Sequence, residues 1–182
     1  MSALEFLMEQ EKVRIRQLKV YDLPALEWGG EFKHYRRLYR EVYDNMCSGQ
    51  ALIWVVDIEF TGIVGQLFVQ LKSICSELAD GLKRAYVYGV RVKPNYRNKG
   101  IGTSLLMTAE ADLVRRGFQW IYLNVSREND AGRRFYERHG YRAIAPESGR
   151  WSYLDHMGHR RHVHEPAWRM QKHISSTKPN SL

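Results

Sequence analysis

Short stretches in which apolar and polar residues alternate run through the chain, and this period of two is typical of β-strands with one buried face. Val13 and Ile15, for example, alternate with arginines. In a later stretch the same alternation predicts that Tyr86, Tyr88 and Val90 share one face. The alternating or β-rich stretches predict strands at residues 13–16, 51–56, 63–71, 84–92, 121–125, 141–145 and 167–170.

Apolar residues spaced three and four positions apart predict helices between several of these strands. Asp22 followed by Pro24 is typical of a helix start, with the aspartate as the N-cap. Further helices are expected over residues 31–46, from Gly102 to Gly117, and after the capping residue Asn129. The first of these carries an aromatic stripe on one face: Phe32, Tyr35, Tyr39 and Tyr43.

The order of these elements predicts the fold class. Early hairpins, followed by strand–helix–strand–helix–strand, indicate an α/β or α+β fold with a partly parallel sheet. The 182 residues favour a single domain, which we place at residues 1–174. Segments 72–83 and 146–165 are expected to be loops, and residues 175–182 a disordered tail.

The composition is basic, because 28 lysines and arginines stand against 20 acids and give a formal net charge of +8. That charge favours anionic partners such as phosphorylated ligands or nucleic acid. Cys47 and Cys75 form no CxxC pair, so neither a disulfide framework nor a zinc site is indicated. The sequence shows no secretion signal and no apolar run long enough for a membrane span. We therefore expect a cytoplasmic protein without a membrane partner; a homodimer is left open.

Four histidines, His156, His159, His162 and His164, lie close together near the C-terminus. They are interleaved with arginines at positions 160 and 161, which would repel a metal cation. We expect no metal site here, and interpret the segment as a solvated loop or a substrate lid.

The stretch VRVKPNYRNKGIG, residues 90–102, joins a predicted strand to a predicted helix and carries four cations and no acid. Backbone N–H groups at a helix start have no partner within the helix and carry the positive end of its dipole. Gly100 and Gly102 leave these groups uncovered, which suits a bound phosphate. From spacing alone, an ordinary strand-to-helix turn with surface cations explains the stretch equally well.

Two motifs in this half of the chain resemble those of the GNAT N-acetyltransferase superfamily. Arg97, Gly100 and Gly102 match its acetyl-CoA signature [RQ]-x-x-G-x-[GA], and the preceding strand resembles its V-x-V-x-P stretch. Residues 129–141 resemble its N-x-x-A-x-x-F-Y-x-x-x-G-F block, with Gly132 in place of alanine and a tyrosine in place of the last phenylalanine. The resemblance covers about residues 84–145. It implies a mixed, mostly antiparallel sheet, flanked by helices and splayed at the acetyl-CoA site.

The resemblance also implies roles for individual residues. Backbone groups of Val90 and Val92, with Arg91 between them, would pair with the pantetheine arm and polarise the thioester. Asn129 would reach the pantetheine and Tyr136 would donate a proton to the departing sulfur; by themselves the two read as a helix cap and a core aromatic. The pyrophosphate would be held by the backbone of Arg97, Asn98, Lys99, Gly100, Ile101, Gly102 and Thr103.

The expected function is transfer of an acetyl group from acetyl-CoA to a primary amine by direct attack. A base is useful for this reaction, because freeing a lysine-like amine from its proton at neutral pH costs roughly 4–5 kcal/mol. We expect Glu59, or a backbone carbonyl, to act through a water relay. The alternatives are a nucleic-acid-binding module, which would not explain the two glycine motifs, and an acyl-CoA-binding module without catalysis.

Overall fold

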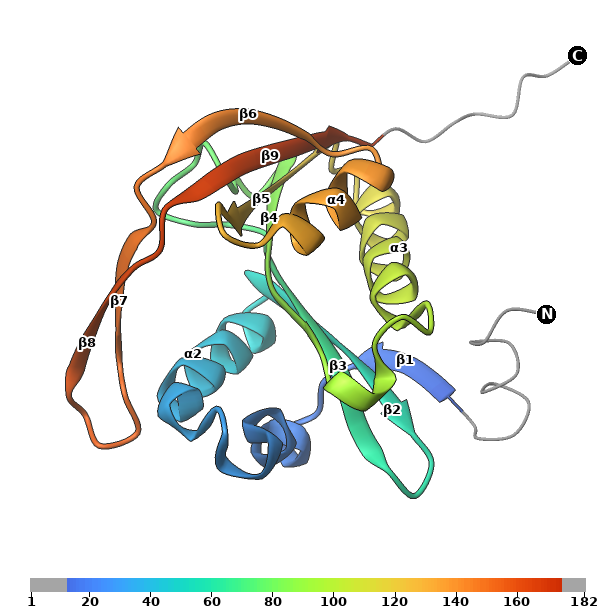
Figure 1. The fold of residues 1–182 in the computed structure, drawn as a ribbon, viewed down its shortest axis with the longest axis vertical. Coiled ribbons are helices and arrows are strands. Elements are labelled where there is room, and N and C mark those ends of the chain that lie inside the picture. The colour runs from blue at the N-terminus through green and yellow to red at the C-terminus, as the bar shows by residue number, and fades with distance from the viewer. Residues whose placement is uncertain (1–12, 175–182) are drawn as a thin grey trace, which may run out of the picture.

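The computed structural model describes residues 13–174, which form an open sheet with helices on both faces (Figure 1). Within this range the main sheet has seven strands in the order β1-β2-β3-β4-β5-β9-β6. All neighbours are antiparallel except β4 and β5, which are parallel. Its strands are β1 (Val13–Gln17), β2 (Ala51–Ile58), β3 (Gly62–Gln70), β4 (Arg84–Val92), β5 (Trp120–Ser126), β6 (Arg142–Glu147) and β9 (Ala167–His173).

The fold class predicted from the sequence is confirmed. The predicted tail at residues 175–182 lies outside the described residues, as does the start of the predicted domain before residue 13. No helix among residues 13–174 is long and apolar enough to cross a membrane.

The helices follow the predicted positions, with two differences at their starts. Asp22 was predicted to be the first N-cap, but Lys19 holds that position. Asp22 lies three residues later and accepts the backbone N–H of Lys19 at 2.8 Å, while Arg16 binds its carboxylate at 2.6 Å. The second helix begins at Arg36 rather than residue 31, after a turn of 3₁₀ helix. The helices are η1 (Val20–Gly30), η2 (Lys33–Tyr35), α2 (Arg36–Cys47), η3 (Pro94–Tyr96), α3 (Ile101–Arg115) and α4 (Asp130–Arg138).

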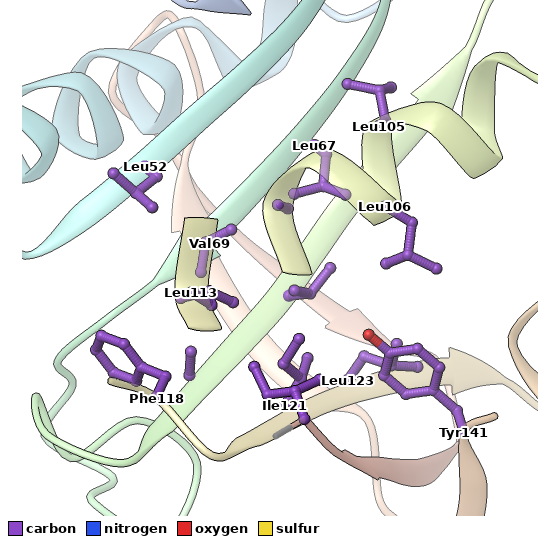
Figure 2. Packing of buried hydrophobic residues seen from close by; sticks show 14 of the residues in the cluster. Leu52, Leu67, Val69, Leu105, Leu106, Leu113, Phe118, Ile121, Leu123 and Tyr141 are labelled. Atoms are coloured by element: carbon purple, nitrogen blue, oxygen red, sulfur yellow. The ribbon is translucent and has the colours of Figure 1, made fainter. Parts of the chain in front are cut away.

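The sheet separates two apolar cores. On one face, α3 packs its leucines against side chains of β3 and β5 (Figure 2). On the other face, η1 and α2 bury the aromatic stripe, with Tyr39 almost fully enclosed. Alternation along β2 supplies both cores, since Leu52 and Val56 face the first and Ile53 and Val55 the second. Both faces being covered explains why the central strands are apolar on both sides.

A bulge in β4 changes the face on which its last residues lie. Gly89 has φ of 61°, and a Cβ there would lie 2.8 Å from the ring of Phe68. The extra residue shifts the register with β3. Tyr88 therefore packs in the α2 core, whereas Val90 packs in the α3 core. The prediction that Val90 shares a face with Tyr86 and Tyr88 is wrong for this reason.

Beyond the bulge the sheet splays. The parallel pairing of β4 and β5 runs only from Arg84 opposite Trp120 to Val87 opposite Leu123. The remaining residues of the two strands pair with β3 and β9 on their outer sides, but not with each other. This opening within the sheet was predicted and is confirmed.

The segment 146–165 is not a loop, contrary to prediction. It contains a second, two-stranded sheet made of β7 (Arg150–Leu154) and β8 (Arg160–His164). This hairpin extends from the β6–β9 end of the molecule towards α2 (Figure 1). Trp151 and Tyr153 meet the ring of Tyr35 at centroid distances of 6.3 and 4.8 Å. The hairpin thus connects the C-terminal half of the fold to the helices on the α2 face.

Candidate active site

A cavity of about 620 Å³ lies where β4 meets α3 and α4; we call it the helix-side cavity. All the residues predicted to hold the cofactor line it except Lys99. Trp28 and Phe32, from the chain before α2, close its opposite side. The structure therefore brings together two motifs that are about thirty positions apart in the sequence. The predicted residues lining the cavity are Val90, Arg91, Val92, Arg97, Asn98, Gly100, Ile101, Gly102, Thr103, Asn129 and Tyr136.

The turn before α3 presents free backbone donors to this cavity. Gly100 is the N-cap of α3 with φ of 83°, and Asn98 also has positive φ, at 59°. The first N–H to be bonded within the helix is that of Ser104, to the carbonyl of Gly100. The preceding N–H groups, from Ile101 to Thr103, belong to the unpaired first turn. An anion at this helix start would meet several aligned donors.

The two glycines of the turn, Gly100 and Gly102, differ in whether the protein backbone requires them. Gly100 is required by its left-handed backbone. Gly102 has no such backbone, and an added Cβ would meet only the ring of Phe135, at an ordinary contact distance of 3.6 Å. The protein itself therefore tolerates a side chain at position 102. Neither the backbone conformation nor the packing around a Cβ therefore requires glycine at position 102.

Two cations of the turn are already engaged. Arg97 donates from Nε to the carbonyl of Val92 at 2.9 Å and so closes the turn. Lys99 lies 5.3 Å from the ring centroid of Tyr96 and points away from the lining. Both still add positive potential close to the helix start.

Asn129 and Tyr136 lie on α4, which borders the same cavity. Asn129 caps α4, and its Oδ1 accepts the N–H of Gly132 at 2.8 Å. A Cβ at Gly132 would lie 2.5 Å from the Asn129 amide, so an alanine at this position would require that side-chain amide to shift. Tyr136 is half-buried between Phe135 and Tyr141, with edge-on ring contacts at 5.1 and 5.7 Å. Each residue thus has a structural role and also faces the cavity.

A second cavity, of about 560 Å³, lies on the α2 side of the splayed strands; we call it the hairpin-side cavity. Its floor comes from β3, β4 and β5, and its outer wall from the start of the β7–β8 hairpin. Six aromatic rings dominate its lining: Tyr35, Tyr39, Phe68, Tyr86, Tyr88 and Trp151. Arg91 lines both cavities, so the two meet at the end of β4.

Two buried phenols lie on either side of this meeting point. The pKa of Tyr86 is raised to about 12, because the effect of burial outweighs that of Arg169, which lowers the pKa, and the nearby Glu147 also raises it. Burial likewise raises the pKa of Tyr136, and the charge that Tyr86 would carry when ionised raises it further. Tyr86 lines the hairpin-side cavity and Tyr136 the helix-side cavity. Both phenols are therefore held protonated at neutral pH.

The structure does not place Glu59, the predicted base, at the junction of the two cavities. Glu59 lies in the turn between β2 and β3 and lines neither cavity. Among residues 13–174, no cluster of three His, Cys, Asp or Glu side chains could hold a metal ion. Three residues that line the hairpin-side cavity, Tyr86, Glu147 and Trp151, were not predicted from the sequence to be site residues. For Trp151 the signal was the alternation of aromatics with polar residues after position 150, which a search for apolar alternation overlooks.

Comparison with known proteins relates the chain to acetyltransferases. The sequence profile of the acetyltransferase (GNAT) family matches residues 18–141. A spermidine N(1)-acetyltransferase of Thermoplasma acidophilum is 35% identical over 75 residues, which is 41% of this chain and 42% of that protein. A mycothiol acetyltransferase of Nocardiopsis dassonvillei is 34% identical over 64 residues, 35% of this chain and 19% of that protein. The chain thus spans less than half of these curated relatives.

Solved structures share the fold across nearly the whole chain. The ribosomal-protein-S18-alanine N-acetyltransferase of Escherichia coli superposes with a TM-score of 0.63 and 20% identity, covering 93% of this chain and 99% of that one. NAA60 of Arabidopsis thaliana in complex with acetyl-CoA superposes with a TM-score of 0.66 and 18% identity, covering 89% and 98%. At these identities the likeness is one of fold.

Proposed function

The chain belongs to the GNAT acetyltransferase family, and we propose that it transfers an acetyl group from acetyl-CoA to a primary amine by direct attack on the thioester. The observation that carries this proposal is the meeting of two cavities at the splayed end of β4. One has the features of a cofactor site, and the other is an aromatic pocket of ligand size. A donor and an acceptor bound in the two could react at their junction.

The helix-side cavity fits acetyl-CoA. The free N–H groups at the start of α3 suit the pyrophosphate, and the absence of a side chain at Gly102 leaves room for it. Each charge-assisted hydrogen bond there would contribute about 1.5–3 kcal/mol. The end of β4, from Val90 to Val92, faces the splay without a strand partner in β5. Its backbone groups would pair with the amide-bearing pantetheine arm.

Direct attack is favoured over a covalent enzyme intermediate. The cysteines Cys47 and Cys75 are both exposed and line neither cavity. The amine nitrogen would attack the carbonyl carbon, the carbon–sulfur bond would break, and one proton would pass from the nitrogen while another reaches the sulfur. Tyr136, protonated and facing the cavity, is the proposed hydrogen-bond donor to the sulfur. The proposal gives Glu59 no role; water at the junction would take the amine proton.

The acceptor is proposed only as a primary amine. One relative is named as a spermidine acetyltransferase, and a structural neighbour as an N-acetyltransferase of an alanine of ribosomal protein S18. These are different kinds of amine. The names therefore support the reaction type and leave the acceptor open.

The test combines cofactor binding with turnover. Saturating acetyl-CoA should stabilise the protein by about 2.7 kcal/mol at a hundredfold excess over Kd. Gly102→Val should fold normally but lose this stabilisation, because the new side chain occupies the ligand space. Ser104→Val is the matched control on the same helix, beyond the free donors. In parallel, release of free CoA thiol is followed with a panel of amines.

The outcomes separate the competing functions. Full stabilisation of Gly102→Val by acetyl-CoA would show that the turn is not the phosphate site. Acetyl-CoA binding without thiol release for any amine would favour a non-catalytic acyl-CoA-binding module. Tight binding of DNA in a titration, without an acetyl-CoA response, would favour the nucleic-acid reading.

A further inference from the structure

Arg91 occupies an unusual place at the junction of the two cavities. The bulge at Gly89 turns its side chain to the α2 face. There its Nη1 donates to the hydroxyl of Tyr39 at 2.9 Å. The guanidinium carbon lies 4.1 Å from the ring centroid of Phe32 and 5.1 Å from that of Tyr35. Aromatic packing thus fixes the guanidinium, and within the described residues 13–174 its side chain makes no hydrogen bond other than the one to Tyr39.

No carboxylate neutralises this guanidinium. Among residues 13–174, no Asp or Glu oxygen lies within ion-pair distance of Arg91. Two acidic residues line the hairpin-side cavity, Glu147 and Glu165. Glu147 is held by Arg169 at 2.6 Å, and Glu165 is exposed at the outer wall. Glu31 lines the helix-side cavity together with Arg91, but it is exposed and makes no ion pair with Arg91. The inner end of the hairpin-side cavity, next to the proposed reaction centre, therefore carries a positive charge that is not ion-paired to any carboxylate among residues 13–174.

A fixed guanidinium without a counterion is a binding group for an anion, and its planar fork matches a carboxylate best. We infer that Arg91 binds a carboxylate of the acceptor, and that the preferred acceptor is a small amine carrying a carboxylate close to the reacting nitrogen. This inference rests on the proposed acetyltransferase function. The aromatic walls of the cavity add a preference for an apolar or aromatic body on the same molecule.

The same charge argues against a polyamine acceptor. A polyamine carries further ammonium groups close to the one that reacts. Arg91 would repel those groups at the junction, and the one inner carboxylate, Glu147, is already paired. A zwitterionic acceptor instead places its carboxylate on Arg91 while its amine, once deprotonated, faces the helix-side cavity.

The experiment compares three acceptors that share one body and differ in one group: phenylalanine, phenylalaninamide and phenethylamine. We expect the wild-type protein to acetylate phenylalanine with the highest kcat/KM. In Arg91→Met, KM for phenylalanine should rise about ten- to a hundredfold, because the variant loses a charge-assisted hydrogen-bonded pair with the carboxylate of the acceptor. KM for phenethylamine and for acetyl-CoA should stay within about twofold. Arg91→Lys should restore part of the preference, since it keeps the charge and loses the fork.

Arg142→Met is the matched control, because Arg142 is an exposed arginine on β6 that lines neither cavity. It should change none of the three KM values appreciably. Acetylation of phenethylamine in preference to phenylalanine by the wild type would overturn the inference and leave the acetyltransferase proposal intact. A rise in KM for acetyl-CoA in Arg91→Met would assign Arg91 to the cofactor instead. Failure to acetylate any amine would overturn both.

Discussion

Tyr136 shows how a single side chain can be set for one chemical task. Its ring is fixed by Phe135 and Tyr141, and its hydroxyl group lies in a half-buried position beside the helix-side cavity. Burial raises its pKa above the ordinary value of a phenol. Arg133, three residues earlier in the sequence, pairs with Glu137 at 2.8 Å and does not lower that pKa. The role proposed for Tyr136 is therefore that of a hydrogen-bond donor rather than a strong acid.

From this we predict the effect of Tyr136→Phe. Full transfer of a proton from an ordinary phenol to a thiolate is uphill by about 2 kcal/mol, and the raised pKa makes it more so. The loss should therefore be at the low end for a positioned acid, about a hundredfold in kcat. Kd for acetyl-CoA should change little, because the phosphates bind elsewhere. The measurement is kcat together with Kd for the folded variant.

Tyr122→Phe provides the control, since Tyr122 lies on β5 and lines neither cavity. An unchanged kcat in Tyr136→Phe would remove the residue from the mechanism. Loss of acetyl-CoA binding together with a lowered Tm would instead show that Tyr136 has a structural role in the core. The pH profile is informative as well. Because its pKa is raised, Tyr136 stays protonated through pH 9, so its removal should lower the profile without changing its shape.

Among the elements, the β7–β8 hairpin depends on a turn held by one carboxylate. Asp155 is buried and accepts the N–H groups of Met157 and His159, each at 2.9 Å, and Nε of Arg161 at 2.8 Å. Burial opposes its ionisation, but these donors outweigh burial and lower its pKa to about 2. The folded hairpin therefore stabilises the ionised form of the Asp155 carboxylate.

We predict that Asp155→Asn lowers Tm by a few degrees at neutral pH and raises KM for the acceptor, because the hairpin walls the acceptor cavity. The pKa in the folded state lies below the value of 3.8 expected in the unfolded chain. The carboxylate therefore stabilises the fold fully above about pH 4, and this stabilisation is lost as the pH falls towards 2.

The difference in Tm between the two proteins should accordingly shrink as the pH is lowered from about 6 to about 3. Asp44→Asn is the control, since Asp44 is exposed and its nearest cation, Arg40, is 3.7 Å away. A Tm difference that stays constant with pH would contradict the assigned role of the Asp155 carboxylate.

The same hairpin marks a limit of prediction from the sequence. The main strands and the helices α3 and α4 were predictable to within a few residues, because apolar periodicity and glycine or asparagine caps define them. In the hairpin, Trp151 and Tyr153 alternate with polar residues over one short stretch of β7, and β8 has Val163 as its one aliphatic residue, so the pattern is weaker than in the main strands. Its position depends on ring contacts with Tyr35, which is more than a hundred residues away in the sequence.

The candidate site was predictable on one side only. The cofactor side is built from two contiguous motifs, and the residues predicted there line one cavity apart from Lys99. The hairpin-side cavity, the proposed acceptor site, is assembled from residues of η2, α2, five strands of the main sheet and the hairpin. The position of Arg91 depends on the bulge at Gly89, which moves every later residue of β4 to the opposite face. No local pattern in the sequence predicts that the residues after Gly89 change face.

For the whole molecule, the splay of the sheet has a mechanical consequence. Four residue pairs, from Arg84–Trp120 to Val87–Leu123, are the backbone pairing between the β1–β4 part and the β5, β9 and β6 part. Such a short seam allows the two parts to hinge, and a ligand that pairs with β4 would act as the missing strand and stiffen the molecule. Amide hydrogen exchange should then slow in both parts when acetyl-CoA binds. Slowing confined to residues 97–103 would mean that the molecule gains no such rigidity, and that the cofactor is held by its phosphates alone.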